Sequence, residues 1–228
     1  MIDLYLIRHA QSHNNALPDE RERICDPPLT EVGHRQAEML AGYLADVRLC
    51  PAVQESVTRL VCSPMLRALE TARYLEQAIG VTPEVWVDIH EHGGIYLDHG
   101  EGRVVGYPGQ TRQQMQSQFP SYALPAEVTD QGWWRGSYEE LWACQGRAIK
   151  VANALRQRTG GRECLVMVSH GTFITCLLKA LLNVLPADYI WFLHHNTGVS
   201  CVQLGAEGRA NVRYLNRVGH LPVELITV

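Results

Sequence analysis

The first apolar run of the chain, Ile2 to Ile7, is rich in β-forming residues and stops at a polar stretch. This pattern predicts a buried strand followed by a functional loop. Thr30 is a good helix N-cap, and the residues beyond it predict a helix because apolar side chains recur at helical spacing, at Ala37, Leu40, Ala41 and Leu44. The chain therefore opens as strand, loop and helix.

Strand and helix signals continue to alternate along the rest of the chain. Ser63-Pro64 predicts the N-cap and first position of a helix, because proline suits the first helical turn. The other signals predict, in chain order, strands at 59–62 and 85–89, a helix at 138–157, a strand at 164–168, a helix at 171–182, and strands at 199–204 and 211–215 around a Gly-Ala-Glu-Gly turn. This order predicts an α/β protein, a three-layer α/β/α sandwich with a mostly parallel central sheet.

The stretch from about 91 to 136 shows weak periodicity and is rich in glycine, proline and aromatic residues. We interpret it as a lid-like insertion within one domain that spans residues 1–228. Two hypotheses remain open for its side chains. In the first, these side chains clamp an organic phosphate and add a second anion site; in the second, they pack the insertion onto the core. The side chains concerned are Tyr96, Tyr107, Phe119, Tyr122, Trp133, Trp134, Arg103, Arg112 and Arg135.

Composition excludes several classes of partner. The net charge of −4 lacks the basic excess of a nucleic-acid binder, so we expect no nucleic-acid partner. We also expect no signal peptide and no membrane span, because charged and polar residues interrupt every apolar segment. The seven scattered cysteines include no C-x-x-C pair and suit a reducing cytoplasm, where we expect the protein to reside.

Three predicted strands end at cationic or imidazole side chains. The first ends at Arg8-His9, the second is followed by Arg67, and the strand at 164–168 is followed by His170. The carboxyl ends of parallel strands line the ligand crevice of an open α/β sheet, so these groups are expected to converge. Two arginines and two histidines in one site indicate phosphate binding.

Arg67 lies in the first turn of its predicted helix, where the helix dipole disfavours a cation by roughly 0.3–1 kcal/mol. A phosphate bound by the guanidinium and by helix N-terminal amides would more than offset this cost. The alternative is a solvated arginine or one paired with Glu70.

Four motifs together resemble the histidine phosphatase superfamily, which includes cofactor-dependent phosphoglycerate mutases and many small-molecule phosphatases. They occur in the family's order and approximate spacing, and they are Leu6-Ile7-Arg8-His9-Ala10-Gln11-Ser12 through Asn15, Leu29-Thr30-Glu31-Val32-Gly33, Ser63-Pro64-Met65-Leu66-Arg67-Ala68 with Thr71-Ala72, and Val168-Ser169-His170-Gly171. The resemblance implies a phosphoglycerate mutase-like fold and no metal or other cofactor.

The resemblance also implies roles for individual residues. His9 would be the nucleophile that accepts phosphate on a ring nitrogen. The phosphate oxygens would be held by Arg8, Arg67, His170 and Asn15, with Gly171 beside them. Glu91 matches the general acid, and His92, Asp98 and Glu101 in the same stretch compete for that role.

The chain departs from the family pattern at two places. Ala10 stands where the family usually has glycine, and its methyl group is small enough to preserve the turn but is expected to narrow the pocket. The residues from His92 to Tyr96 differ from the arginine- and tyrosine-rich signature of the mutases, which favours a phosphatase over a mutase. The expected reaction is metal-independent hydrolysis of a small phosphorylated metabolite through a phosphohistidine. A cofactor-dependent phosphoglycerate mutase and a non-catalytic phosphate-binding relative remain alternatives, and the oligomeric state stays open, a homodimer included.

Two other chemistries compete. His90, Glu91 and His92 invite a metal site, but in an extended segment the two histidines would face away from the glutamate. Ser169 resembles a serine nucleophile, yet Met167 stands where the tight turn of that motif requires glycine.

Overall fold

The computed structural model describes residues 1–46, 57–158, 161–187, 189–205 and 207–228. Its main sheet has the strand order β3-β2-β6-β1-β7-β8. Parallel pairing joins β1 (Ile2–Arg8), β2 (Arg59–Cys62), β3 (Pro83–Val85) and β6 (Glu163–Ser169). Antiparallel pairing joins β7 (Val199–Leu204) to β1 and β8 (Ala210–Arg217) to β7. The predicted mostly parallel sheet is confirmed.

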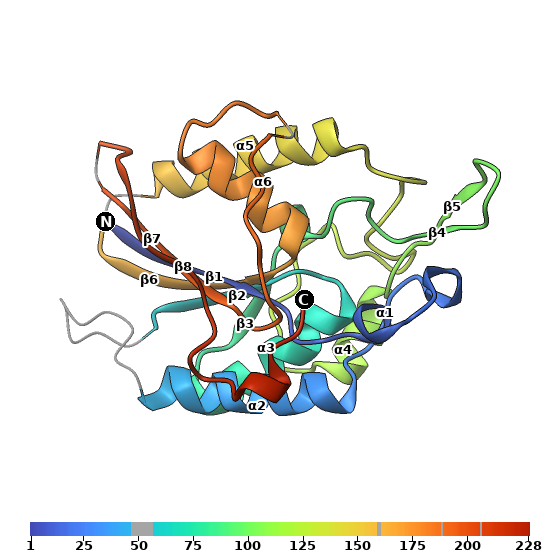
Figure 1. Cartoon of the computed structure of the whole chain (residues 1–228), viewed down its shortest axis with the longest axis horizontal. Helices are drawn as coiled ribbons and strands as arrows, with labels where there is room; N and C mark the ends of the chain where they lie inside the picture. Colours follow the sequence, from blue (N-terminus) through green and yellow to red (C-terminus); the bar gives the residue numbers. More distant parts are fainter. Residues whose placement is uncertain (47–56, 159–160, 188, 206) are drawn as a thin grey trace.

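Helices cover both faces of this sheet (Figure 1). The helices α2 (Glu31–Asp46) and α3 (Leu66–Ile79) lie on one face, and α5 (Leu141–Gln157) and α6 (Gly171–Leu181) lie on the other. A hydrophobic core lies on each face of the sheet, and alternate residues of β1 belong to the two cores. Tyr5 and Ile7 pack toward α2 and α3, whereas Leu4 and Leu6 pack toward α5 and α6. A strand buried on both faces reads as a continuous apolar run, and the sequence shows such a run here. The three-layer architecture is therefore confirmed.

Of the two residues predicted to cap helices, Thr30 does so and Ser63 does not. Thr30 caps α2, because its Oγ1 accepts the backbone N–H of Gly33 at 3.0 Å. Ser63 does not cap α3, which begins three residues later at Leu66. The free N–H of Leu66 donates instead to the carboxylate of Asp26, 40 residues away in the chain, at 3.0 Å. A distant carboxylate thus replaces the local cap, and the Ser63 side chain is left for another partner.

The strand expected at 85–89 was wrong. The strand β3 ends at Val85, opposite Cys62, and residues Val87–Ile89 form the 3-10 turn η2. The carbonyl of Ile89 accepts the hydroxyl of Ser169 at 2.7 Å, which draws this turn across the end of β6. The turn therefore directs the following residue pair, His90-Glu91, toward the carboxyl edge of the sheet.

The stretch at 91–136 contains a hairpin of β4 (Tyr96–Asp98) and β5 (Val104–Gly106) and the helix α4 (Arg112–Gln118). Phe119, Tyr122 and Trp133 are buried in the same core as α3, so the packing hypothesis holds for these aromatics. Arg112 donates to the carbonyls of Val128, Leu124 and Pro125 and thereby stabilises the stretch itself.

Shorter elements complete the described chain: the helix α1 (His13–Ala16) and the 3-10 turns η1 (Glu20–Glu22) and η3 (Val223–Leu225). No helix within the described ranges is long and apolar enough to cross a membrane. The six cysteines in these ranges are free thiols, and Cys50 lies outside the described residues.

Candidate active site

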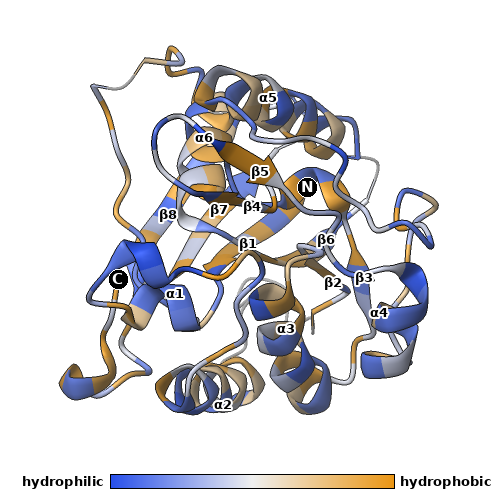
Figure 2. Cartoon of the chain, turned by 90° about the vertical axis from the view of Figure 1, so that its right-hand side faces the viewer, coloured by the Kyte–Doolittle hydropathy of each residue, from blue (hydrophilic) through white to orange (hydrophobic). Residues whose placement is uncertain are grey.

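The carboxyl ends of β1, β2 and β6 meet at one edge of the sheet, which faces the viewer in Figure 2. Arg8 is level with Ser169, and Cys62 is level with Val168. The residues one position further along, His9, Ser63 and His170, are therefore neighbours. The rings of His9 and His170 have their centroids 5.0 Å apart. The expected convergence of the three strand ends is what the structure shows.

The ring of His9 is buried and has a defined orientation. Its Nδ1 lies 2.7 Å from the carbonyl oxygen of Ala10, and the Nε–H of Arg67 donates to its Nε2 at 3.1 Å. A carbonyl only accepts and a guanidinium only donates, so both contacts assign the proton to Nδ1 and the lone pair to Nε2. Burial, and then the charges of Arg67 and Arg8, hold the pKa of His9 well below its ordinary value. The ring is therefore neutral near pH 7.

The two guanidinium groups are held from different sides of the site. Arg67 comes from the first turn of α3, and its nearest carboxylate is that of Asp26, 3.9 Å from Nη1. Glu70, the alternative partner, accepts the N–H of Leu29 instead. Arg8 donates from Nη1 to the carbonyl of His194 at 2.6 Å, and its buried Nε has no partner among the described residues.

His170 is positioned by the serine that does not cap α3. The Nε2 of His170 lies 2.7 Å from the hydroxyl oxygen of Ser63, which also accepts the N–H of Met65 at 3.3 Å. The hydroxyl hydrogen of Ser63 is then free to donate to Nε2, which leaves the proton of the neutral ring on Nδ1. That Nδ1 is buried and has no partner in the described part of the chain. Burial is the main cause of the lowered pKa of His170, and the charge of Arg67 adds to it.

The carboxylate of Glu91 is fixed by three backbone N–H groups. It accepts from His92 at 2.9 Å, from Phe173 at 3.0 Å and from Thr172 at 3.2 Å. The last two belong to the first turn of α6, where the helix dipole favours an anion. These three hydrogen bonds therefore hold the carboxylate of Glu91 in one position at the site.

Asn15 contributes its amide nitrogen to the site. Its Oδ1 accepts both the backbone N–H and the hydroxyl of Ser12, at 3.1 and 2.9 Å, and the Nδ2 of Asn196 approaches the same oxygen at 3.5 Å. The oxygen is thus fully used, and Nδ2 is the part of Asn15 that is available to a ligand.

A small cavity of about 120 Å³ opens among these groups, and we call it the phosphate cavity after the ligand that the sequence predicts. Its lining includes Arg8, His9, Asn15, Arg67, Glu91 and His92. His170 lies behind it, fully buried, and Gly171 sits beside the guanidinium of Arg8. His92 lies at the cavity wall with Nε2 3.2 Å from the hydroxyl of Tyr138. Two weaker candidates for the acid, Asp98 and Glu101, are exposed and do not line the cavity.

Three residues have positions at this site that the sequence did not predict, although Ser63 was expected as a helix cap. Asp26 and Ser63 act through Arg67 and His170, and Arg23 lines the phosphate cavity. The contacts of Asp26 and Ser63 join segments about 40 and 107 residues apart, so no local sequence pattern predicts them. The expected anion groups Arg103 and Arg135 do not line the cavity, whereas Tyr96 does.

In the part of the chain that the structure describes, neither the metal-site alternative nor the serine-nucleophile alternative has the side-chain arrangement that it requires. Within the described residues, no group of three or more histidine, cysteine, aspartate or glutamate side chains gathers around one point. The hydroxyl of Ser169 is fully buried and donates to a carbonyl. Ala10 is also fully buried and packs with Leu29 and Ala37, so its methyl group does not narrow the cavity.

Proteins that are similar to this chain identify its family. The family model described as "Histidine phosphatase superfamily (branch 1)" matches residues 4–217. A relative from Yersinia pestis named probable phosphoglycerate mutase GpmB is 28% identical over 190 residues, which are 82% of this chain and 77% of that protein.

Two solved structures share the fold. The protein YhfR from Bacillus stearothermophilus superposes with a TM-score of 0.64 at 20% identity, over 96% of this chain and 99% of that chain. A phosphoserine phosphatase variant from Entamoeba histolytica, in complex with phosphoserine, gives 0.62 at 21% identity, over 97% and 100%. With a family model matched over nearly the whole chain, this protein belongs to the histidine phosphatase superfamily.

Proposed function

We propose that this protein hydrolyses a small phosphomonoester through a phosphohistidine formed on His9. The observation that carries the proposal is the orientation of the His9 ring, whose Nδ1–H is bonded to Ala10 and whose Nε2 lone pair meets Arg67 at the phosphate cavity. A neutral imidazole with a fixed tautomer is a good nucleophile near neutral pH. In the first half-reaction, Nε2 forms a bond to phosphorus and the ester oxygen leaves.

The groups around His9 suit the charge of the transferring phosphoryl group. Arg8 Nε and His170 Nδ1 are buried donors that lack partners among the described residues, and phosphate oxygens would satisfy both. Arg67 and the Nδ2 of Asn15 complete the cradle. Such preorganised donors supply the main stabilisation in phosphoryl transfer. Because the cradle is itself cationic, it neutralises the phosphate without a metal ion, and we expect full activity in the presence of a chelator.

Glu91 is the group that we propose moves the proton. The monoanion of a phosphomonoester carries a proton with a pKa of about 6, and Glu91 relays that proton to the departing alkoxide. In the second half-reaction Glu91 takes a proton from water while the water oxygen attacks phosphorus and the bond from phosphorus to Nε2 breaks. Phosphate then leaves with that proton, and His9 and Glu91 return to their starting forms.

The proposal is tested by turnover of p-nitrophenyl phosphate. The parent is expected to release p-nitrophenol equally well with and without a chelator, and His9→Ala is expected to lose the activity. His99→Ala is the matched control, because His99 is an exposed histidine that does not line the cavity. Equal rates for the parent and His9→Ala would remove His9 from the mechanism.

A phosphoglycerate mutase is the second candidate, favoured by the relative from Yersinia pestis that bears that name. Both reactions use the same nucleophile and phosphate cradle and differ in the group that accepts the phosphoryl group from His9. Isomerisation of 3-phosphoglycerate, measured with and without a bisphosphoglycerate primer, distinguishes them. Primer-dependent isomerisation faster than phosphate release would favour the mutase.

A further inference from the structure

Arg147 is a buried cation that the proposed chemistry does not use. It comes from α5, its side chain is 9% exposed, and it does not line the phosphate cavity. Its Nε and Nη2 donate to the two carboxylate oxygens of Glu139, at 2.8 and 2.5 Å, and Nη2 also donates to Sγ of Cys144 at 3.6 Å. Its Nη1 donates to the carbonyls of Asp88 and His90, at 2.7 and 3.0 Å. These contacts use all five N–H donors of the guanidinium, so Arg147 is a holding group and not a free anion-binding group.

The contacts of Nη1 hold the backbone that leads into Glu91. Asp88 lies in the turn η2, and the carbonyl of His90 belongs to the peptide group that joins His90 to Glu91. Because a peptide group is planar and rigid, any movement of that carbonyl moves the backbone of Glu91 with it. Arg147 thus fixes the direction in which the chain leaves the turn.

Arg147 also contacts the helix end that binds the carboxylate of Glu91. Its Cζ lies 4.7 Å from the centre of the Phe173 ring, in a cation–π contact, and this ring is fully buried. The backbone N–H of Phe173 donates to Oε1 of Glu91 at 3.0 Å. Arg147 therefore touches both segments that fix Glu91, the turn that precedes it and the first turn of α6.

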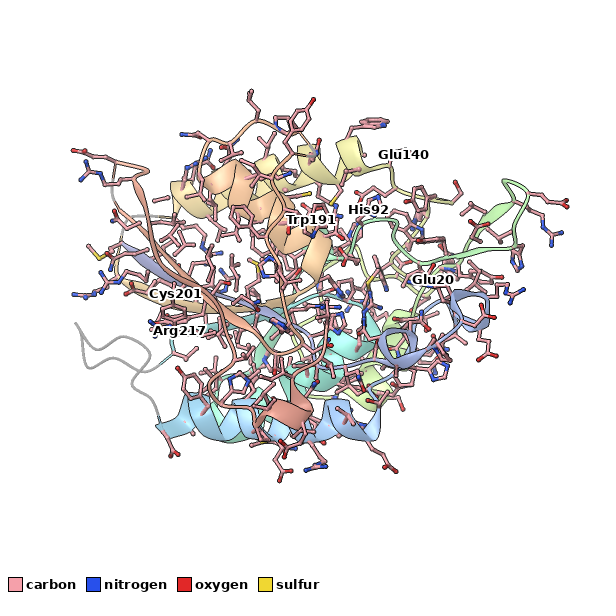
Figure 3. All side chains as sticks on the ribbon, viewed as in Figure 1. Glu20, His92, Glu140, Trp191, Cys201 and Arg217 are labelled. Carbon is pink, nitrogen blue, oxygen red and sulfur yellow. The ribbon has the colours of Figure 1, made fainter. Side chains whose placement is uncertain are left out.

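Glu139 holds Arg147 in this place. The two parallel hydrogen bonds between a carboxylate and a guanidinium fix the plane of the guanidinium. The backbone N–H of Glu139 donates to the carbonyl of Gly93 at 3.1 Å, two residues beyond the proposed acid. Figure 3 labels the neighbours His92 and Glu140, which lie on the same side of the molecule near the start of α5. The ion pair is thus anchored to the segment that it supports.

The ion pair between Arg147 and Glu139 has no second cation in His90. The Nε2 of His90 lies 3.7 Å from Glu139, but burial, and then the charge of Arg147, lowers the pKa of His90 to about 3. The His90 ring is therefore neutral near pH 7. Removal of Arg147 alone would leave the charge of Glu139 buried and unpaired, which is strongly destabilising. An informative variant has to keep a cation at this position or remove both charges together.

Resting on the function proposed above, we propose that Arg147 is the positioning residue of the general acid, because it keeps the carboxylate of Glu91 within reach of the ester oxygen. It acts through the carbonyl of His90 and the ring of Phe173. A proton transfer needs hydrogen-bond distance between the acid and the departing oxygen. Loss of the support is therefore expected to slow the reaction of leaving groups that need a proton and to spare those that do not.

The test compares phenyl phosphate with p-nitrophenyl phosphate, since phenolate is the more basic leaving group and gains more from a proton. Arg147→Lys keeps a positive charge beside Glu139, but a single ammonium does not bind the carboxylate and the carbonyls together. Its kcat/KM for phenyl phosphate is expected to fall by roughly 10–10²-fold, the loss typical of a small misplacement. Its kcat/KM for p-nitrophenyl phosphate is expected to fall by less than about threefold, which also shows that the variant is folded.

A variant without the ion pair extends the comparison. Arg147→Gln combined with Glu139→Gln removes both charges, and so leaves no buried charge unpaired. It is expected to show the same dependence on the leaving group as Arg147→Lys, with a larger loss on phenyl phosphate, because lysine retains part of the support.

Arg156→Gln is the matched control. Arg156 lies in the last turn of the same helix and donates to the carbonyls of Ala180 and Leu181, at 3.1 and 2.9 Å. Its replacement weakens the contact between α5 and α6 without touching the segments that fix Glu91. This variant is expected to keep the parent's ratio of kcat/KM for the two substrates.

A second measurement asks whether Arg147 acts through Glu91. In a Glu91→Gln background the acid is already absent, so adding Arg147→Lys is expected to lower kcat/KM for phenyl phosphate by less than about twofold. A role in general packing would instead multiply the two losses.

Three outcomes would overturn the inference. These are an equal loss, or no loss, on the two substrates in Arg147→Lys, the same leaving-group dependence in Arg156→Gln, and losses that multiply in the Glu91→Gln background. In each of these the parent still hydrolyses both substrates, so the proposed function stands. If the parent hydrolyses neither substrate, or if Glu91→Gln affects both equally, the proposed function or the proposed role of Glu91 has failed, and the inference fails with it.

Discussion

The Nε–H of Arg67 points at the Nε2 lone pair of His9, 3.1 Å away. One contact thus joins the nitrogen proposed as nucleophile to a group proposed to hold the phosphate. The contact must break before Nε2 attacks phosphorus, and the released guanidinium is then placed to bind the phosphate oxygens. Arg67 can therefore both maintain the reactive tautomer of His9 and stabilise the charge that develops later.

Replacement of Arg67 by lysine tests this dual role. Lysine keeps the positive charge but loses the planar fork and the Nε–H, so we expect kcat/KM to fall by roughly 10²–10³-fold, the loss typical of a charge-stabilising donor. Steady-state kinetics with p-nitrophenyl phosphate measure the effect. Arg73→Lys, on the same helix but bonded to the carbonyl of Gln118, is the control. A loss of less than about threefold would show that charge alone suffices.

The acid side of the pH profile depends on the charges beside His9. Its pKa is lowered mainly by burial, then by Arg67 and Arg8. Because the neutral ring is the nucleophile, activity is lost only as pH falls through this lowered pKa. Arg8→Gln removes one cation, raises the pKa of His9 and moves the acid limb of kcat/KM to higher pH. The parent and the variant are compared on the same substrate, so that the titration of the substrate affects both equally. An acid limb of kcat/KM that stays in place or moves to lower pH would contradict the assignment of neutral His9 as the nucleophile.

Glu91→Gln is expected to affect substrates according to their leaving group. An alkoxide needs a proton as it departs, whereas p-nitrophenolate is stable without one. We therefore expect kcat/KM to fall by roughly 10²–10⁴-fold for an alkyl phosphate and far less for p-nitrophenyl phosphate. The same kinetics on Glu101→Gln, an exposed glutamate outside the cavity, provide the control. Equal losses on both substrates would mean that Glu91 is not the acid.

The ionisation of Asp26, which lies beside Arg67, affects the free energy of unfolding of the protein. Burial raises the pKa of this carboxyl to about 6, against the opposing effects of Arg67 and the N–H of Leu66. The folded state therefore holds the proton more tightly than the unfolded state, and this group lowers the free energy of unfolding as pH rises from about 4 to about 6. The loss approaches about 3 kcal/mol above that range.

Asp26→Asn isolates this contribution, because asparagine keeps an oxygen for the N–H of Leu66 and cannot ionise. Urea unfolding at a series of pH values should show the variant gaining stability relative to the parent between about pH 4 and pH 6. A difference that is constant with pH would show that Asp26 is not responsible.

The sequence predicted the parts of the fold that depend on local pattern. The apolar runs of β1 and β6, buried on both faces, and the Thr30 cap of α2 are found as expected. The run Val85–Ile89 misled, because alternating apolar residues do not distinguish a strand from a 3-10 turn whose Ile89 carbonyl is bonded to Ser169.

In the candidate site, the residues at the strand ends could be predicted from the sequence. The residues that position them could not. His9 and His170 follow buried strands, so the topology of a parallel sheet brings them together. Ser63 was predicted to be a helix cap. The contacts of Asp26 with Leu66 and Arg67, and the position of Arg23 at the cavity, arise only once distant segments have folded together. Tertiary contacts between distant segments do not change the local pattern of apolar and polar residues, so the sequence pattern cannot predict them.

The most direct test of the account is to trap the phosphorylated protein. Glu91→Gln, which slows the attack of water, is mixed with substrate carrying a radiolabelled phosphoryl group, quenched in alkali and digested. The account predicts an acid-labile, alkali-stable label on the peptide that contains His9. The label should form and decay at rates that account for the turnover of Glu91→Gln, and it should be absent from a variant that also carries His9→Ala. Turnover without such a label, or a label on any other residue, would contradict it.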